Sequence, residues 1–254
     1  MNSAIVRALL VRGMLAGLGA GMLTFAFAYF VGEGSVDAAI AFEESNSHHA
    51  AGGEELVSRS VQSTAGLATG VLVFGVAVGG IAALAFCFAL GRIGQFGARA
   101  TAALTALAAF LTVYLVPTLK YPANPPAVGN PDTLDQRTAL YFLMIALSVL
   151  LGIAAVLLGR RLAPGWGNWN ASTAAGLAFL AAVTVAMVFL PSGDNVPNGF
   201  PATDLWEFRM ASLGVQALLW AAFGLLFGYL AERVLEPRAT ASAGRGAELS
   251  APAA

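Results

Sequence analysis

Six apolar runs, each about as long as a helix that crosses a bilayer, constrain this chain more than any other feature. A membrane-spanning helix needs about 20 consecutive apolar residues. The predicted fold class is therefore all-α, a polytopic membrane helix bundle with six transmembrane helices. The predicted spans are residues 8–31, 64–90, 100–119, 138–159, 171–191 and 208–230.

Composition supports a membrane protein and leaves no room for a soluble domain. The 254 residues are 58% hydrophobic and 11% charged, whereas soluble domains carry about 25% charged residues. We expect one membrane domain over residues 1–238. Residues 239–254 are rich in Ala and Ser without apolar periodicity, which predicts a disordered tail. Cys87 is the only cysteine, so an internal disulfide and a Cys-rich metal cage are excluded.

The charges are sorted along the chain in a way that predicts its orientation. Lys and Arg in short loops mark the cytoplasmic side. The six-span arrangement puts nine basic residues on one side and four on the other, which predicts that both termini are cytoplasmic. The first apolar run is longer than the 7–15 residues of a signal-peptide core, so we expect it to be retained. Eleven of the 14 acidic residues fall on the predicted outer side, where they would concentrate cations.

Glycines recur four residues apart in three of the predicted spans. This spacing lets helices approach closely in lipid, so it predicts a compact bundle. The glycines concerned are Gly13, Gly17 and Gly21 in the first span, Gly66, Gly70, Gly75 and Gly79 in the second, and Gly224 and Gly228 in the sixth.

Two proline-rich connectors on the predicted outer side resemble each other. Residues 117–137 contain five prolines, of which four, at 122, 125, 126 and 131, lie between two spans. Proline blocks helical continuation, so this connector is rigid and irregular. Its Tyr-Pro-Ala at 121–123 matches Phe-Pro-Ala at 200–202, and Asp-x-x-Asp-x-Arg at 132–137 matches Asp-x-x-Glu-x-Arg at 204–209. The match predicts a parallel repeat of two hairpins, spans 3–4 and spans 5–6.

The acidic residues of these connectors allow a structural and a functional interpretation. An Asp three residues before an Asp or Glu is typical of a helix cap, and acids near a helix start are favoured by its dipole. Glu207 and Arg209 lie at the edge of an apolar span, where charges are usually paired. We predict the ion pairs Arg209–Asp135 and Arg137–Glu207. The candidate residues for an ion entrance or a structural hairpin are Tyr121, Asn124, Asp132, Asp135, Arg137, Asn195, Asp204, Glu207, Arg209 and Gln216.

Residues 33–59 form a predicted outer loop that holds both histidines of the chain. Glu43, Glu44, His48 and His49 are the candidate metal ligands, since imidazole and carboxylate together suit divalent ions such as cobalt, nickel and zinc. No fixed spacing of a structural zinc motif is present. The alternative is a solvated acidic loop with two incidental histidines.

Catalytic motifs are missing from the sequence. It contains neither a phosphate-binding Gly-Lys-Ser/Thr loop nor a nucleophile paired with a base, so we predict that the chain is not an enzyme. Nothing in the sequence predicts a nucleic-acid partner.

Three segments carry a family resemblance. Lys-Tyr-Pro-Ala-Asn-Pro-Pro-Ala-Val-Gly at 120–129, Asn-x-Pro-x-x-Phe-Pro-Ala at 195–202, and Leu-Trp-x-Phe-Arg-x-Ala-Ser-Leu-Gly at 205–214 resemble the CbtA family of predicted cobalt transporter subunits. The resemblance runs from the first span to about residue 232. It implies a multi-pass protein of the bacterial inner membrane, cobalt as the transported substrate without an organic cofactor, and a link to cobalamin synthesis. It also implies a CbtB-like partner, a small single-span protein with a histidine-rich end.

A membrane enzyme with its site at Asp135, Glu207 and Arg209 on the outer face is disfavoured, because no nucleophile paired with a base is visible. Two other functions are compatible with these observations. In the first, the chain is a subunit of a cobalt uptake system. Its outer acidic and histidine loop captures the ion, and its proline-rich hairpins form the entrance. In the second, the chain is a non-transporting scaffold whose outer hairpins bind a partner protein. A homo-oligomer is compatible with both.

Overall fold

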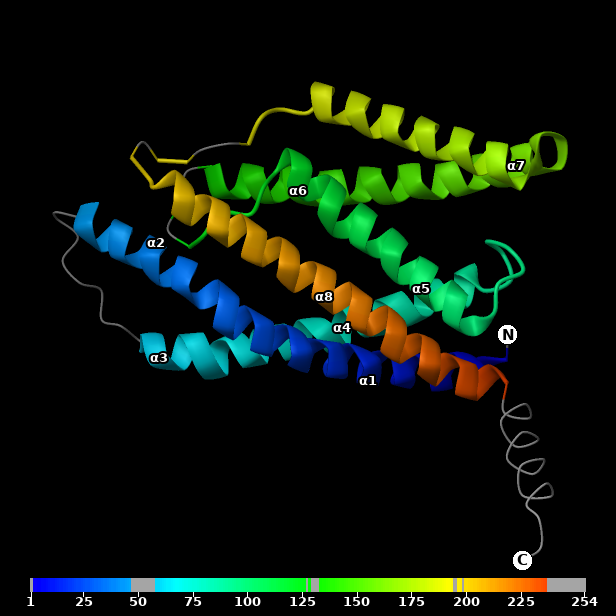
Figure 1. Ribbon diagram of the computed structural model, residues 1–254, viewed down its shortest axis with the longest axis horizontal. Helices are drawn as coiled ribbons and strands as arrows, with labels where there is room; N and C mark the ends of the chain where they lie inside the picture. Colours follow the sequence, from blue (N-terminus) through cyan, green and yellow to red (C-terminus); the bar gives the residue numbers. More distant parts are fainter. Residues whose placement is uncertain are drawn as a thin grey trace, which may run out of the picture. The chain divides into compact units, whose positions relative to one another are not determined.

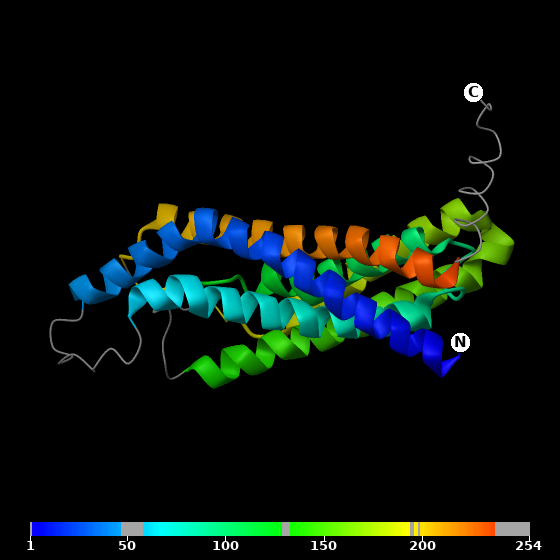
Figure 2. The ribbon, with the colours of Figure 1, turned by 90° about the horizontal axis from the view of Figure 1, so that it is seen from below.

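The computed structural model describes residues 2–46, 58–126, 128, 133–193, 196–197 and 199–236. Over these residues every element is a helix, as Figures 1 and 2 show, which confirms the all-α prediction. The predicted tail, residues 239–254, lies outside the described residues. The elements are α1 (Ser3–Phe27), η1 (Ala28–Gly32), α2 (Glu33–Asn46), α3 (Arg59–Val61), η2 (Gln62–Gly66), α4 (Leu67–Ala89), α5 (Ala98–Ala109), η3 (Phe110–Leu115), α6 (Val116–Lys120), α7 (Leu134–Phe189) and α8 (Ala202–Leu235), where η marks a π-helical turn.

Within the described residues, five helical stretches are long and apolar enough to cross a membrane. They are Ser3–Ser45, Arg59–Ala89, Ala98–Lys120, Leu134–Phe189 and Ala202–Leu235. The first, third and sixth predicted spans each lie within one of these helices, and the second extends one residue beyond Ala89. The fourth lies within α7, and the fifth begins in α7 and extends two residues beyond Phe189.

Helix α7 is a helical hairpin. A straight helix of 56 residues would extend about 84 Å, far more than the roughly 30 Å of a hydrocarbon core. The helix breaks at Gly167, which has a φ of 75°. Glycine adopts this positive φ readily because it has no Cβ, whereas other residues disfavour it. A Cβ at Gly159 would lie 3.3 Å from Ala175, and one at Gly152 would lie 3.9 Å from Phe179. From Gly159 back to Gly152 on the first arm, the contacted residue on the second arm moves forward from Ala175 to Phe179. The two arms therefore run antiparallel (Figure 1).

Residues 33–46 are helical, so the prediction of a loop over this range is wrong. Helix α2 continues from α1 through the π-helical turn η1. Its acidic residues suggested a loop, but alanine and glutamate are good helix formers. The helix also buries an apolar edge, because Ala39 is fully buried and Phe42 packs against its cluster with Val128 and Phe200.

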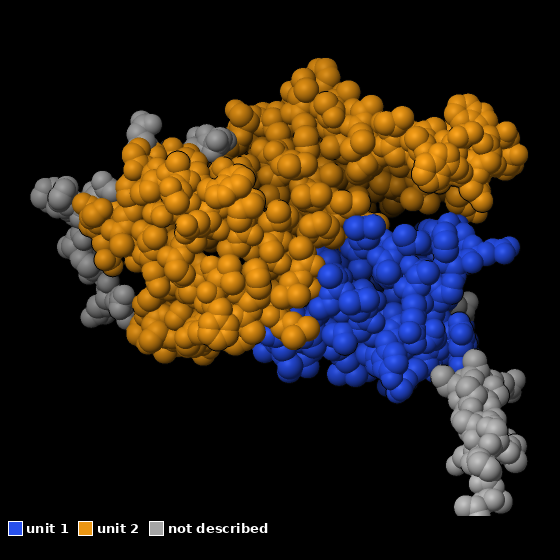
Figure 3. Space-filling view, in the orientation of Figure 1, with its two compact units in different colours: residues 1–22, 71–107, 219–254 blue, residues 23–70, 108–218 orange. Residues whose placement is uncertain are grey.

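The first of two compact units comprises residues 1–22, 71–107 and 219–254, drawn blue in Figure 3 where described. Here α1 crosses α4 at glycines. A Cβ at Gly17 would collide with the carbonyl oxygen of Gly75, and a Cβ at Gly75 would lie 2.6 Å from the carbonyl oxygen of Gly17. Gly21 lies against Val71, so the two helices run antiparallel past each other. The predicted close approach of glycine-bearing helices is confirmed here.

A second close contact of this unit joins α8 to α5. A Cβ at Gly224 would lie 2.9 Å from the Cβ of Ala106, and one at Gly228 would lie 3.3 Å from the Cα of Arg99. The Arg99 guanidinium also forms an ion pair with Glu232 of α8, with 2.5 Å between Nη2 and Oε2. The predicted role of Gly224 and Gly228 in packing is therefore confirmed.

The second unit comprises residues 23–70 and 108–218, drawn orange in Figure 3. Its α6–α7 core is built on Val116, Tyr121, Met144 and Val183, which joins α6 and the following loop to both arms of α7. Ser148 of α7 donates a hydrogen bond to the carbonyl of Thr112, which lies in the π-helical turn η3. Gly70 belongs to this unit and has nothing within 4 Å of a Cβ added to it, so the predicted packing role is wrong at this position.

Candidate functional site

The two proline connectors of the second unit are held together by polar contacts. We call residues 121–133 the first proline loop and residues 190–201 the second proline loop. The phenol of Tyr121 donates a hydrogen bond to the carbonyl of Pro191, with 2.9 Å between the oxygens. Tyr121 is 8% exposed, and a Cβ at Gly193 would lie 2.8 Å from its ring. One side chain of the first loop is therefore fixed against the start of the second.

Arg209 holds the first proline loop to the beginning of α8. Its Nε donates to the carbonyl of Ala123 at 3.2 Å, and its Nη2 donates to Oδ1 of Asn124 at 2.9 Å. A planar guanidinium can bind two acceptors at once, which orients the loop as well as holding it. We call the contacts of Arg209 with Ala123 and Asn124 the loop clamp. The clamp joins the Tyr-Pro-Ala-Asn-Pro-Pro segment to the helix that follows the second loop.

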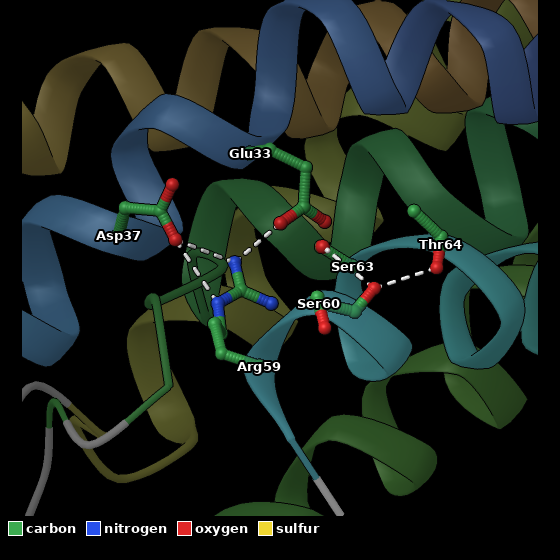
Figure 4. A network of polar contacts seen from close by, with 6 residues as sticks. All are labelled: Glu33, Asp37, Arg59, Ser60, Ser63 and Thr64. Carbon is green, nitrogen blue, oxygen red and sulfur yellow. Dashed lines mark hydrogen bonds and ion pairs between the residues drawn. The ribbon is translucent and has the colours of Figure 1, made fainter.

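A second polar group joins α2 to α3. Glu33 and Asp37 lie one turn apart on α2 and both face Arg59, as Figure 4 shows. The Arg59 Nε donates to Oδ1 of Asp37 at 3.0 Å, and Nη2 bonds to Glu33 and lies 2.9 Å from Asp37. The side chain of Glu33 is 17% exposed, compared with 63% for Asp37. We call these three residues the ion triad.

The residues around Arg59 fix the start of its helix. The carbonyl of Ser60 accepts hydrogen bonds from the hydroxyls of Thr64 at 2.6 Å and Ser63 at 3.4 Å (Figure 4). The triad was missed at the sequence level. Its one signal was an acidic pair four residues apart, a spacing that places two side chains on one helix face. Because residues 33–46 were predicted to form a loop, the helical spacing of these two acids was not recognised.

The family model described as probable cobalt transporter subunit, CbtA, matches residues 6–232. The chain belongs to the CbtA family. The match includes both proline loops, the loop clamp and the ion triad. Comparison with curated proteins and with solved structures finds no match for the chain. Membership makes the chain a probable cobalt transporter subunit, a description that fits its apolar helices. The family description names a transporter subunit and no catalytic activity.

The structure places the predicted hairpin residues of this CbtA member at helix starts. Asp135 lies exposed in the first turn of α7, and Asp204 lies half-buried in the first turn of α8. Asp204 is inside the helix, since α8 begins at Ala202, so its prediction as the capping residue is wrong. Its position near the positive end of the helix dipole still favours its charge. Glu207 is exposed, and Gln216 is half-buried further along α8.

The predicted ion pair Arg209–Asp135 is wrong within the described part of the chain. Arg209 binds Asn124 and the backbone of Ala123 instead. The first proline loop turns back toward α8, so its neutral oxygens reach the guanidinium. The pair Arg137–Glu207 stays a prediction. Asp132 and Asn195 lie outside the described residues.

The predicted metal ligands fall at the edge of the described structure. Glu43 and Glu44 are exposed near the end of α2, and His48 and His49 lie outside the described residues. Within the described ranges, no group of three or more His, Cys, Asp or Glu side chains is arranged to hold a metal ion.

Proposed function

We propose that this CbtA member is the membrane subunit through which cobalt enters a bacterial cell for cobalamin synthesis. The observation that carries the proposal is the family match over residues 6–232, which names cobalt and a transporter subunit. The proposal adds a location in the inner membrane, an orientation, a capture site, an entrance and a partner. The location and the partner follow from what the family resemblance implies, and the other additions rest on features of the sequence and the structure.

Six crossings with both termini in the cytoplasm account for the helices. The two arms of α7 return antiparallel at Gly167, and each arm contains one predicted apolar span. Counting the arms separately turns five long helices into six crossings. The excess of basic residues at the termini and even-numbered connections supports the orientation.

Capture of the cation is assigned to the end of α2 and the residues after it. Helix α2 carries four acidic residues and no basic residue. Arg59 balances one charge of the pair Glu33 and Asp37, while Glu43 and Glu44 add negative charge shortly before His48 and His49 in the sequence. Carboxylates attract a divalent cation, and imidazole nitrogens are good ligands for cobalt.

The entrance is assigned to the two proline loops. Their known contacts involve Tyr121, Asn124 and Arg209, three of the residues singled out in the sequence. Breaking the hydrogen bond from Arg209 would free the side-chain oxygen of Asn124. That oxygen would then be able to bind a hydrated ion. Asp135 and Glu207 would add negative charge near the starts of α7 and α8, the helices that follow these loops.

A partner is implied by the word subunit, and we propose a CbtB-like, single-span protein with histidines. The described residues hold no metal cluster of their own. Histidines from a partner would complete a cobalt site that this chain supplies only in part. The surrounding lipid bilayer is the other partner, and a homo-oligomer is compatible with the same arrangement.

Uptake of radiolabelled cobalt tests the proposal. Cells without other cobalt importers would express the chain with and without the small partner. We expect uptake to require the chain and to fall roughly tenfold or more in His48→Ala/His49→Ala, as for loss of groups that support a metal site. Glu43→Gln/Glu44→Gln should reduce it less. Glu236→Gln is the matched control, because Glu236 is an exposed acid just after the C-terminal end of α8.

The outcomes separate the two functions. Uptake that is intact in the histidine variant but lost in Asn124→Ala would move the capture site to the proline loops. No uptake with or without the partner, from a protein that folds in the membrane, would favour the scaffold whose outer hairpins bind a partner protein.

A further inference from the structure

The turn between the two arms of α7 carries two arginines and two tryptophans. Arg160 and Arg161 lie near the end of the first arm, and Trp166 and Trp169 flank the break at Gly167. We call residues 160–169 the basic turn. Both arginines are exposed, and the tryptophans are 57% and 83% exposed. These two large aromatic side chains are not covered by the core of the second unit, so something outside it must cover their apolar surface.

The positive charge of the basic turn is not compensated by its surroundings in sequence or structure. No Asp or Glu occurs from residue 136 to residue 193. Within the described residues, neither Arg160 nor Arg161 takes part in an ion pair, in contrast to Arg59 and Arg99. The guanidinium groups of these two exposed residues can therefore donate to a bound ligand. Guanidinium donors match the geometry of phosphate oxygens.

Apolar surface borders this charge on both arms. Leu157 on the first arm is 52% exposed, and Leu177 on the second is 62% exposed. A soluble phosphate could use the arginines, but it would leave the leucines and tryptophans in water. A phospholipid satisfies all of them, because its acyl chains cover apolar side chains and its headgroup reaches the arginines. Tryptophan prefers the boundary between these two regions.

We propose that the basic turn binds the phosphate headgroup of an anionic phospholipid. Arg160 and Arg161 hold the phosphate, and Trp166 and Trp169 fix the turn at the depth of the headgroups. The inference rests on the proposed crossing of the membrane by each arm of α7, which puts the turn at a membrane surface. It assigns a lipid-binding role that is separate from cobalt transport.

Tryptophan quenching tests this proposal in the full-length protein. The chain has four tryptophans, so Trp206→Phe/Trp220→Phe leaves only those of the basic turn. The protein is placed in vesicles that contain phosphatidylglycerol or phosphatidylcholine with brominated acyl chains. We expect both lipids to quench, with a clear preference for phosphatidylglycerol. Arg160→Gln/Arg161→Gln should lower that preference roughly tenfold, given the attraction of each basic residue to an anionic surface.

The matched control changes two other arginines. Arg7→Gln/Arg12→Gln removes the same charge from α1, far from these tryptophans in sequence, and should leave the preference unchanged. Free inorganic phosphate at millimolar concentration should not displace the lipid. If the tryptophan background fails to fold, native mass spectrometry of the wild type and Arg160→Gln/Arg161→Gln measures retained phosphatidylglycerol directly.

Three results would overturn the proposal in distinguishable ways. Absence of quenching by either lipid would place the turn away from the membrane and would also contradict the six crossings. Strong and equal quenching by both lipids would keep the crossings and remove the selectivity. A preference that survives Arg160→Gln/Arg161→Gln would show that other groups recognise the headgroup. None of these results bears on cobalt uptake.

Discussion

The two units of the molecule are held by different kinds of contact. In the first unit, α1 meets α4 where Gly17 and Gly75 bring backbone against backbone. In the second, the proline loops are held by side chains that donate to loop oxygens, through Tyr121 and Arg209. The glycine contact leaves no room for a side chain, whereas the loop contacts depend on the side chains of Tyr121 and Arg209.

The contrast teaches where this protein can change conformation. Glycine has no side chain that could adopt another rotamer, and separating the two helices would lose many dispersion contacts at once. A hydrogen bond contributes only about 1 kcal/mol net, because water or another ligand can replace it. The proline loops are therefore the part in which an exchange of partners costs least. This supports their assignment as the entrance for the ion.

The largest expected effect is that of Gly17→Ala. Its methyl group would collide with the carbonyl oxygen of Gly75, so we expect destabilisation of about 2–3 kcal/mol, as for overpacking of a tight core. The control is Gly70→Ala, also within a helix but with open space at its Cβ. That variant should be neutral or slightly stabilising, because alanine favours helix by up to about 1 kcal/mol. Thermal unfolding in detergent measures both, and similar midpoints for the two would contradict the contrast.

The loop clamp should show an intermediate effect in a double-mutant cycle. Arg209→Gln and Asn124→Ala each break the same hydrogen bond, so we expect a coupling of about 1–2 kcal/mol, typical of a bond to a charged group. The same cycle with Asp135→Asn should give a coupling near zero, because Asp135 is not the partner of Arg209. Coupling to Asp135 and none to Asn124 would restore the ion pair first predicted from the sequence.

The ion triad should show the smallest effect and the strongest dependence on salt. Glu33→Gln should cost about 1 kcal/mol and Asp37→Asn less than about 0.5 kcal/mol, because exposed ion pairs contribute little. The ranking follows exposure, which is 17% for Glu33 and 63% for Asp37. Unfolding midpoints at low and high salt are the measurement. A larger loss in Asp37→Asn would mean that burial does not set the strength of these contacts.

The sequence predicted the helices better than their connections. Apolar runs and glycine spacing are local signals, and they identified the helices and the close packing at Gly17 and Gly224, though not which helices meet there. The helical extension over residues 33–46 was missed, because its acids suggested a loop while Ala39 and Phe42 find apolar partners far away in the sequence.

The candidate site was predicted in its residues but not in its pairing. Asn124 and Arg209 were both singled out, yet opposite charge was taken to decide the partner of Arg209. A folded loop can offer a carbonyl and an amide oxygen at the right distance, and only its three-dimensional path reveals that. The ion triad depends in the same way on contacts across 22 and 26 residues of sequence.

The return of α7 at Gly167 also bears on the order in which the chain assembles. The cost of closing a loop grows with the logarithm of its length, and Gly159 and Ala175 are near neighbours in sequence. The bond from Tyr121 to Pro191 spans 70 residues, and that from Arg209 to Asn124 spans 85. The hairpin can therefore form while the ribosome is still adding α8, and the clamp can close only after Arg209 has been made. The segment assigned to transport is then among the last parts of the second unit to reach its native structure.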